Sequence, residues 1–241
     1  YIFFNKYNRK FNFMKTGIFL SYKGLGANLL HLSYCHEIAK KFEPVTLITL
    51  CPNLDRVLKD DPSFKEVIYL EKFHKRFFDL IKLSKFLKKF NFENIFIFYP
   101  SLRHYLACKI AGIKNIYHYP LFKKKNLHLV NAAKNFTEKS INIKNCPTET
   151  QIFLNNEKIK NYNLSKKKRI ILGIGSSGPT TKWGYDNFAS LINKLNEIGD
   201  YHFYLVCGKN EEEGAIKIIN QIKKNNCESL STKDVSEIIY Y

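Results

Sequence analysis

Short apolar runs alternate along most of the chain with stretches in which apolar residues recur at helical spacing. The runs predict buried strands at residues 16–21, 45–50, 66–70, 94–98 and 115–119. The helical spacing predicts helices at residues 29–41, 55–59, 76–90, 101–111 and 127–137. Repeated strand–helix units indicate a mostly parallel sheet with helices on both faces.

The alternation stops in a polar stretch at residues 142–168 and then resumes. The later pattern predicts strands at 170–174 and 202–207 and helices at 186–198 and 211–224. We therefore expect an α/β fold with two Rossmann-like domains built on parallel sheets. The expected first domain is 14–150, the linker is 151–168, and the second domain is 169–241. The second is expected to be incomplete, because such sheets commonly hold about five or six strands.

Both ends of the chain depart from the strand–helix alternation. Residues 1–13 show no clear period, and Met14, the only methionine, precedes the first expected strand. We expect residues 1–13 to be a non-native leader. The chain ends within a helix-like pattern at 235–241, so we expect it to be a fragment.

The composition limits the classes of protein to which this chain can belong. A hydrophobic content of 45% indicates packed cores rather than disorder. The net charge of +18 favours nucleic acid, anionic lipid or phosphorylated ligands as partners. AT-rich coding would produce the same excess of Lys, Asn, Ile, Phe and Tyr, so the charge alone assigns no partner.

The cysteines and the apolar runs indicate the cellular compartment of the protein. The six cysteines form no C-x-x-C pair and fall mostly in apolar runs, which favours reduced, buried thiols in a cytoplasmic protein. No apolar run approaches the roughly 20 residues of a membrane span. The sequence shows no signal peptide of the usual form.

The segment 173–183 is the most informative part of the chain. A predicted strand runs into Gly-Ile-Gly-Ser-Ser-Gly-Pro-Thr-Thr-Lys-Trp, and a predicted helix follows. Small residues leave backbone N–H groups free to face an anion, and a helix N-terminus adds partial positive charge. The segment is not a P-loop, because the G-K-[ST] ending is missing. A solvated loop with one surface lysine, Lys182, and a Trp183 that packs the helix is the alternative.

Two further turns follow predicted strands. Gly24 and Gly26 come after the first strand and either allow a ligand to approach the backbone or form a tight turn. Glu211, Glu212 and Glu213 start a predicted helix, where carboxylates are favourable on dipole grounds alone. Because ligands bind beyond the carboxyl ends of parallel strands, a glutamate here could accept hydrogen bonds from ribose hydroxyls. The seven histidines show no metal-ligand spacing, and no metal is expected.

Taken together, these segments resemble glycosyltransferase family 9, the ADP-heptose:lipopolysaccharide heptosyltransferases. The resemblance lies in the opening turn at 21–32, the segments 45–50, 54–59 and 61–68, the Ala-Gly-Ile turn at 111–116, the loop 173–183 with Lys182-Trp183, and the Glu-rich helix start at 207–213. It implies a GT-B fold, whose second domain binds a nucleotide-sugar donor and whose first domain binds the acceptor. It also implies inverting, metal-independent transfer without a cofactor.

The resemblance assigns roles to individual residues. Donor binding falls to Ser176, Ser177, Thr180, Thr181 and Lys182, which would neutralise the leaving diphosphate, and to Glu212 or Glu213, which would hold the ribose. Gly24 and Gly26 form the acceptor-side loop, and Arg103 is a candidate contact for acceptor phosphate.

The sequence departs from the family at two places. The family's catalytic base is an Asp directly after the second Gly of the opening turn, where this chain has Ala27 followed by Asn28. The family's Asp-Thr-Gly-x-x-His segment would lie beyond Tyr241.

The expected function is sugar transfer, of heptose or a similar sugar, from a nucleotide-sugar to a lipopolysaccharide-core or other glycolipid acceptor. We expect the protein to be bacterial and cytoplasmic, with peripheral contact to the inner face of the cytoplasmic membrane. A catalytically inactive nucleotide-sugar-binding or interaction protein of the same fold is the alternative. Nucleic acid is not an expected partner, because no recognised motif is present.

Overall fold

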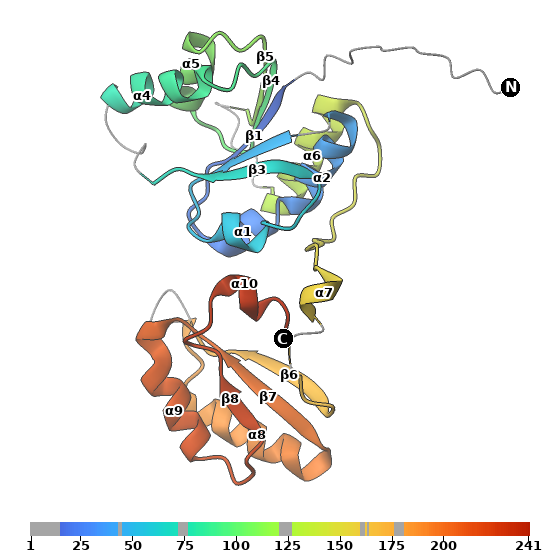
Figure 1. Ribbon diagram of the computed structural model, residues 1–241, viewed down its shortest axis with the longest axis vertical. Coiled ribbons are helices and arrows are strands. Elements are labelled where there is room, and N and C mark those ends of the chain that lie inside the picture. The colour runs from blue at the N-terminus through green and yellow to red at the C-terminus, as the bar shows by residue number, and fades with distance from the viewer. Residues whose placement is uncertain are drawn as a thin grey trace, which may run out of the picture. The chain divides into compact units, whose positions relative to one another are not determined.

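The computed structural model describes residues 15–42, 45–71, 77–120, 127–159, 162, 164–175 and 181–241, with backbone only at residues 77 and 78. The chain divides into two compact units, residues 1–153 and 154–241 (Figure 1). Each unit carries its own sheet and its own core.

The first unit is built on a five-stranded parallel sheet. The strands are β1 (Thr16–Leu20), β2 (Val45–Thr49), β3 (Phe64–Tyr69), β4 (Asn94–Ile97) and β5 (Asn115–His118). Their order is β3-β2-β1-β4-β5, and every neighbouring pair is parallel. This is the Rossmann order without a sixth strand, and β1 lies at the centre. All residues of β1, β2 and β4 are buried, as expected for central strands covered on both faces.

Helices cover both faces of this sheet. On one face, α4 (Phe77–Lys88) and α5 (Leu102–Ile110) share a core with Phe19, Ile95 and Ile97. On the other face lie α2 (Leu32–Phe42) and α6 (Leu129–Ile141). There the rings of Phe42 and Phe96 approach to 5.6 Å, and those of Phe98 and Phe136 to 5.0 Å. Figure 1 shows the two helix pairs on opposite sides of the sheet. Two short helices, α1 (Leu25–Leu29) and α3 (Leu54–Val57), follow β1 and β2.

The second unit carries a three-stranded parallel sheet. The strands β6 (Lys168–Gly173), β7 (Tyr201–Val206) and β8 (Cys227–Ser229) are arranged in that order. The helices α8 (Tyr185–Ile198) and α9 (Glu212–Asn220) share a core with Ile174, Phe203 and Leu205. A 3-10 turn, η2 (Lys209–Glu211), precedes α9, and short helices α7 (Asn156–Ile159) and α10 (Val235–Ile238) complete the unit.

The helix expected at 29–41 is α2, which begins only at Leu32, after the separate short helix α1 that ends at Leu29. The ring Nδ1 of His31 lies 2.6 Å from the carbonyl of Ala27, which in a continuous helix would accept from the backbone N–H of His31. That N–H donates to the carbonyl of Asn28 instead. The break leaves the apolar spacing intact, so the sequence pattern could not reveal it.

Two further differences lie in the second unit. Strand β8 was not expected, because Cys227-Glu228-Ser229 has no alternation of its own; it forms by pairing with β7, with Phe203 opposite Cys227. The helix expected at 211–224 begins as η2 and ends at Asn220, where the backbone turns toward β8.

A buried hydrogen bond between two side chains ties α2 to the loop before β3. His36 Nε2 lies 2.8 Å from a carboxylate oxygen of Asp61, whose side chain is 3% exposed. The backbone N–H of Ser63 donates to the other oxygen at 3.0 Å. Burial alone would raise the pKa of Asp61, but the hydrogen bonds from His36 and Ser63 outweigh it, so that the pKa is lowered.

The cysteines are free thiols, four of them buried and two partly buried. Burial raises the pKa of Cys108 and of Cys227 to about 12, and raises that of Cys35 further. Such thiols stay protonated at neutral pH and are poor nucleophiles.

Candidate functional site

In the second unit, the loops after β6 and β7 bring a cation and a carboxylate together. Lys182 lies just before α8, and its Nζ is 2.9 Å from Oε1 of Glu211, at the end of η2. The Glu211 side chain is 16% exposed, whereas that of Lys182 is 37% exposed. The hydrogen bond to Glu211 holds the pKa of Lys182 above its usual value, so this lysine is a cation at neutral pH.

Two glycines make room for this arrangement. A Cβ at Gly175 would overlap Oε2 of Glu211, so this glycine leaves room for the carboxylate in its observed position beside the backbone after β6. A Cβ at Gly214 would overlap the Tyr185 ring. Tyr185 also helps to raise the pKa of Lys182, although less than Glu211 does. The close packing of α8 on α9 at Gly214 thus helps to hold the ring beside the lysine.

The expected donor-binding residues fall into two groups. Ser176, Ser177 and Thr180 lie outside the described residues. Thr181 and Lys182 are exposed, and the sequence pattern predicts both at this edge of the sheet. Glu212 is half-buried and Glu213 is exposed, both in the first turn of α9.

Sequence reasoning missed Glu211 as the partner of Lys182 and missed Tyr185. The three consecutive glutamates were the available signal. A 3-10 turn of Lys209–Glu211 before α9 turns the first of them toward Lys182, and no periodicity distinguishes such a turn from the helix itself. Trp183 is 54% exposed and meets Phe188 edge-on at 5.0 Å, so it packs on α8 at the surface.

This edge of the sheet suits an anionic ligand. Lys182 supplies a full charge, and α8 begins three residues later, at Tyr185 after Gly184. An anion bound to Lys182 would compete with the Glu211 carboxylate, because the ammonium group already donates to it. Binding of an anion at Lys182 would therefore require an exchange of partners on its ammonium group.

The opening turn of the first unit is held by Asn28, which is fully buried. Its Nδ2 donates to the carbonyl of Tyr22 at 2.9 Å and to that of Gly24 at 2.7 Å. Its Oδ1 accepts from the Thr49 hydroxyl at 3.2 Å. Asn28 thus joins the turn after β1 to the end of β2, which is a structural role.

His31 also packs against the opening turn of the first unit. Its Nε2 lies 3.1 Å from the Tyr119 hydroxyl, and its ring stacks on Tyr22 with centroids 4.8 Å apart. Burial lowers its pKa, so the ring is neutral at pH 7. Because Nδ1 donates to Ala27, Nε2 is left to accept the Tyr119 proton. Sequence reasoning did not connect these residues, which lie far apart along the chain.

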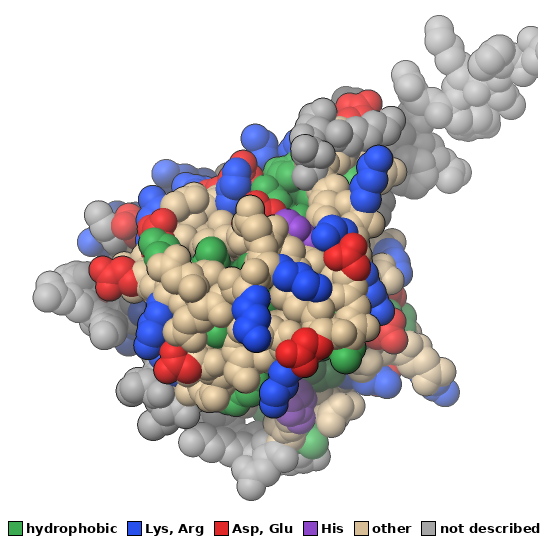
Figure 2. All heavy atoms as spheres, turned by 90° about the horizontal axis from the view of Figure 1, so that it is seen from below, with side chains coloured by type: hydrophobic (Ala, Val, Ile, Leu, Met, Phe, Trp, Pro, Cys, Tyr) green, Lys and Arg blue, Asp and Glu red, His purple; other side chains and the backbone are tan. Residues whose placement is uncertain are grey.

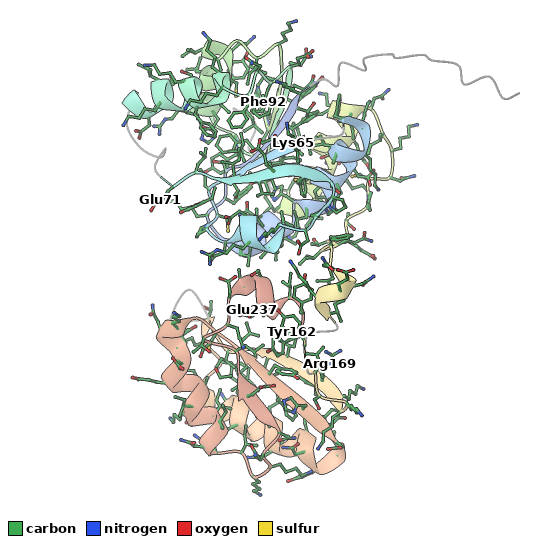
Figure 3. All side chains as sticks on the ribbon, in the orientation of Figure 1. Lys65, Glu71, Phe92, Tyr162, Arg169 and Glu237 are labelled. Carbon is green, nitrogen blue, oxygen red and sulfur yellow. The ribbon has the colours of Figure 1, made fainter. Side chains whose placement is uncertain are left out.

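The other expected acceptor-side residues lie at the carboxyl edge of the first sheet. Gly24 and Gly26 are exposed, and Ala27 is half-buried. Arg103 is half-buried in the first turn of α5, after β4. Two carboxylates follow the neighbouring strands at this edge: Asp55 in α3, after β2, and Glu71, which follows β3 (Figure 3).

Metal ligands and membrane spans were sought in the same residues. Within the described ranges, no group of three or more His, Cys, Asp or Glu side chains could hold a metal ion. None of the helices in that part of the chain is long and apolar enough to cross a membrane.

No protein-family model matches the chain, and no curated protein matches it. Solved structures do. A glycosyltransferase family 9 protein from Veillonella parvula superposes with a TM-score of 0.76 at 15% identity, over 95% of this chain and 72% of that one. ADP-heptose lipopolysaccharide heptosyltransferase II of E. coli gives 0.69 at 16% identity, over 94% and 76%. The E. coli heptosyltransferase WaaC, solved with ADP-2-deoxy-2-fluoro heptose, gives 0.64 at 13% identity, over 94% and 79%.

These similarities are at the level of fold. They confirm the expected α/β architecture with two Rossmann-like units and parallel sheets. The expected resemblance to the heptosyltransferases is also confirmed in three dimensions. The chain therefore has the GT-B-type fold of the family 9 glycosyltransferases.

Proposed function

We propose that this protein is a glycosyltransferase that moves a sugar from a nucleotide-sugar donor to a glycolipid acceptor. The observation that carries the proposal is the pairing of Lys182 with Glu211 at the carboxyl edge of the second sheet, in a fold shared with heptosyltransferases. One of those relatives was solved with an ADP-sugar analogue. The donor sugar is proposed to be heptose or a similar sugar, and the acceptor a lipopolysaccharide core or another glycolipid.

Lys182 is proposed to neutralise the diphosphate that leaves during transfer. No metal or cofactor takes part in this scheme, so the charge must come from this lysine, from hydroxyls of the same loop and from the N-terminus of α8. Glu212 or Glu213, in the first turn of α9, is proposed to accept hydrogen bonds from the ribose. The transfer is proposed to invert the anomeric centre at the inner face of the cytoplasmic membrane.

Inverting transfer needs a carboxylate base near the acceptor hydroxyl. Ala27 cannot serve, and Asn28 is committed to Tyr22, Gly24 and Thr49. Asp55 and Glu71 follow the neighbouring strands β2 and β3 and are the carboxylates that we would test first.

Calorimetric titration with ADP- and UDP-sugars tests the donor site. Lys182→Ala should weaken nucleotide binding about ten-fold or more, because a charge-assisted contact to phosphate is lost. Lys167→Ala is the matched control: Lys167 also pairs with a carboxylate, Asp200, at 2.8 Å, but at the amino-terminal edge of the same sheet. Equal affinities for both variants and the parent protein would remove the phosphate role from Lys182.

Transfer itself is tested with a glycolipid acceptor. Ala27→Asp should raise turnover if the lost carboxylate limits the rate, and Ala27→Asn should not. If nucleotide-sugars bind but neither the parent protein nor Ala27→Asp transfers sugar to any glycolipid, the protein binds the donor without catalysis and the transferase proposal is wrong.

A further inference from the structure

The helix α5 exposes its large aliphatic side chains and buries its small ones. Leu102, Leu106 and Ile110 are 52%, 40% and 58% exposed. Ala107 and Cys108, from the same helix, are fully buried against the sheet. A helix that covers a sheet normally turns its large apolar residues inward. The arrangement on α5 is the reverse of this, and it leaves an apolar outer face uncovered among the described residues.

The three exposed residues form one stripe. They are spaced at i, i+4 and i+8, which places them one above the other along the outer side of the helix. We call Leu102, Leu106 and Ile110 the α5 stripe. None of its members belongs to the buried core cluster beneath α5 or to the partly buried residues packed against that cluster.

Exposed lysines lie on α4 and α5 and just after them. On α4, whose apolar side shares the core cluster with α5, Lys82, Lys85 and Lys88 are exposed, and Lys89 is exposed just after it. Because α4 and α5 lie side by side on one face of the sheet, their outer sides belong to the same surface of this unit (Figure 1). Lys109 and Lys114 are exposed on and just after α5. By contrast, the face seen in Figure 2 intersperses Lys and Arg with Asp and Glu.

We infer that the α5 stripe and the lysines of α4 form a docking surface for an anionic phospholipid bilayer. Aliphatic side chains flanked by lysines can enter the headgroup region while the ammonium groups bind lipid phosphate. The helix α5 is 9 residues long, so it would lie in the interface and would not span. The inference names the surface for the glycolipid-bearing membrane of the proposed function and rests on that function only for its biological role.

The charge argues against two other occupants. A second copy that bound through the same surface would bring lysine rows against lysine rows. A single-stranded nucleic acid would use exposed aromatic rings for stacking, whereas the stripe consists of two leucines and an isoleucine. Neither partner uses both the aliphatic stripe and the cations as a bilayer does.

Co-sedimentation of the full chain with lipid vesicles tests the inference. Binding to vesicles of phosphatidylglycerol and phosphatidylcholine in equal parts should be at least about ten-fold tighter than to phosphatidylcholine alone, and should weaken as salt rises to about 0.5 M. The triple variant Leu102→Ser, Leu106→Ser, Ile110→Ser should lose about ten-fold or more of that affinity. Ile198→Ser with Ile216→Ser is its control, since these side chains of the second unit are 75% and 49% exposed.

A charge-matched pair separates a local surface from net charge. Lys85→Ser with Lys88→Ser should weaken binding about 25-fold, or about five-fold for each lysine. Lys139→Ser with Lys144→Ser removes the same charge from the opposite face of the sheet, because Lys139 lies in α6 and Lys144 follows it. This pair should change binding less than two-fold. All of these side chains are exposed, and circular dichroism checks that each variant is folded.

The inference is wrong if the stripe and control variants bind vesicles equally, or if the parent protein does not prefer anionic vesicles. It is also wrong if the triple variant changes only self-association in analytical ultracentrifugation. Vesicle binding does not require nucleotide, so a failed donor titration would overturn the proposed function and leave this result standing.

Discussion

Replacing Asn28 by Asp tests whether the turn after β1 can carry a carboxylate one residue beyond Ala27. The amide Nδ2 of Asn28 donates to the carbonyls of Tyr22 and Gly24, so the substitution turns two donated hydrogen bonds into two contacts between acceptors. A buried group left without its partner costs about 1–3 kcal/mol, which gives about 2–6 kcal/mol for the two carbonyls. That is a large part of the roughly 5–15 kcal/mol that stabilises a typical domain.

Urea unfolding followed by circular dichroism measures this cost. With a slope of about 2 kcal/mol per molar urea, a loss of about 4 kcal/mol moves the midpoint of the first unit down by about 2 M. Ala27→Asp is the control: residue 27 is half-buried and its side chain donates nothing, so its midpoint should move by less than about 0.5 M.

The pH dependence of the Asn28→Asp variant has a definite sign. Burial beside two carbonyls raises the pKa of the new carboxyl above its unfolded value of about 3.9. The penalty is therefore full above the folded pKa and shrinks as pH falls toward the unfolded pKa, because the protonated acid can donate one hydrogen bond. A variant as stable as the parent at pH 7 would mean that the Asn28 amide does not donate to these carbonyls.

Three further predictions concern the first unit. Because hydrogen bonds with His36 and Ser63 lower the pKa of Asp61, its carboxylate contributes stability that is present above about pH 4 and is lost as pH falls through the folded pKa. Asp61→Asn should therefore cost about 2 kcal/mol in urea unfolding at pH 7 and less at pH 3, and equal costs would contradict the role of these hydrogen bonds. Gly17→Ala should destabilise by about 1–3 kcal/mol, since its Cβ would meet the Phe92 ring at 3.1 Å, and a neutral result by thermal unfolding would show that the ring moves freely. Gly26→Ala, in helix α1 with nothing within 4 Å of its Cβ, should instead stabilise by about 0.5–1 kcal/mol, and a lower melting temperature would refute this.

The fold was predictable because each strand and helix carries its own periodic signal. All strands expected in the first unit are present, and the shift of the expected strand 66–70 to Phe64–Tyr69 is within the usual uncertainty of element ends. Parallel pairing in both sheets, and coverage of the first sheet on both faces, then follow from the strand–helix alternation. In the second unit α8 and α9 pack together on one core, and Ile171 of β6 is exposed.

Features set by contacts between distant residues were not predictable. The break before His31 depends on a ring that competes with a backbone N–H, and β8 exists through its pairing with β7. At the candidate site, the sequence pattern predicted Lys182. It could not show which of three adjacent glutamates pairs with this lysine, because Glu211 is directed toward it by the 3-10 conformation of η2. The roles proposed for Ser176, Ser177 and Thr180 stay predictions.

The buried thiols also allow the two units to be followed separately in solution. Cys35 and Cys108 are fully buried in the first unit, and Cys227 is partly buried in the second, each with a raised pKa. An alkylating reagent reacts with such groups chiefly after local or global opening exposes them as free thiolates. Mass spectrometry of the modified peptides would therefore report the opening rate of each unit from the natural sequence, without an introduced label.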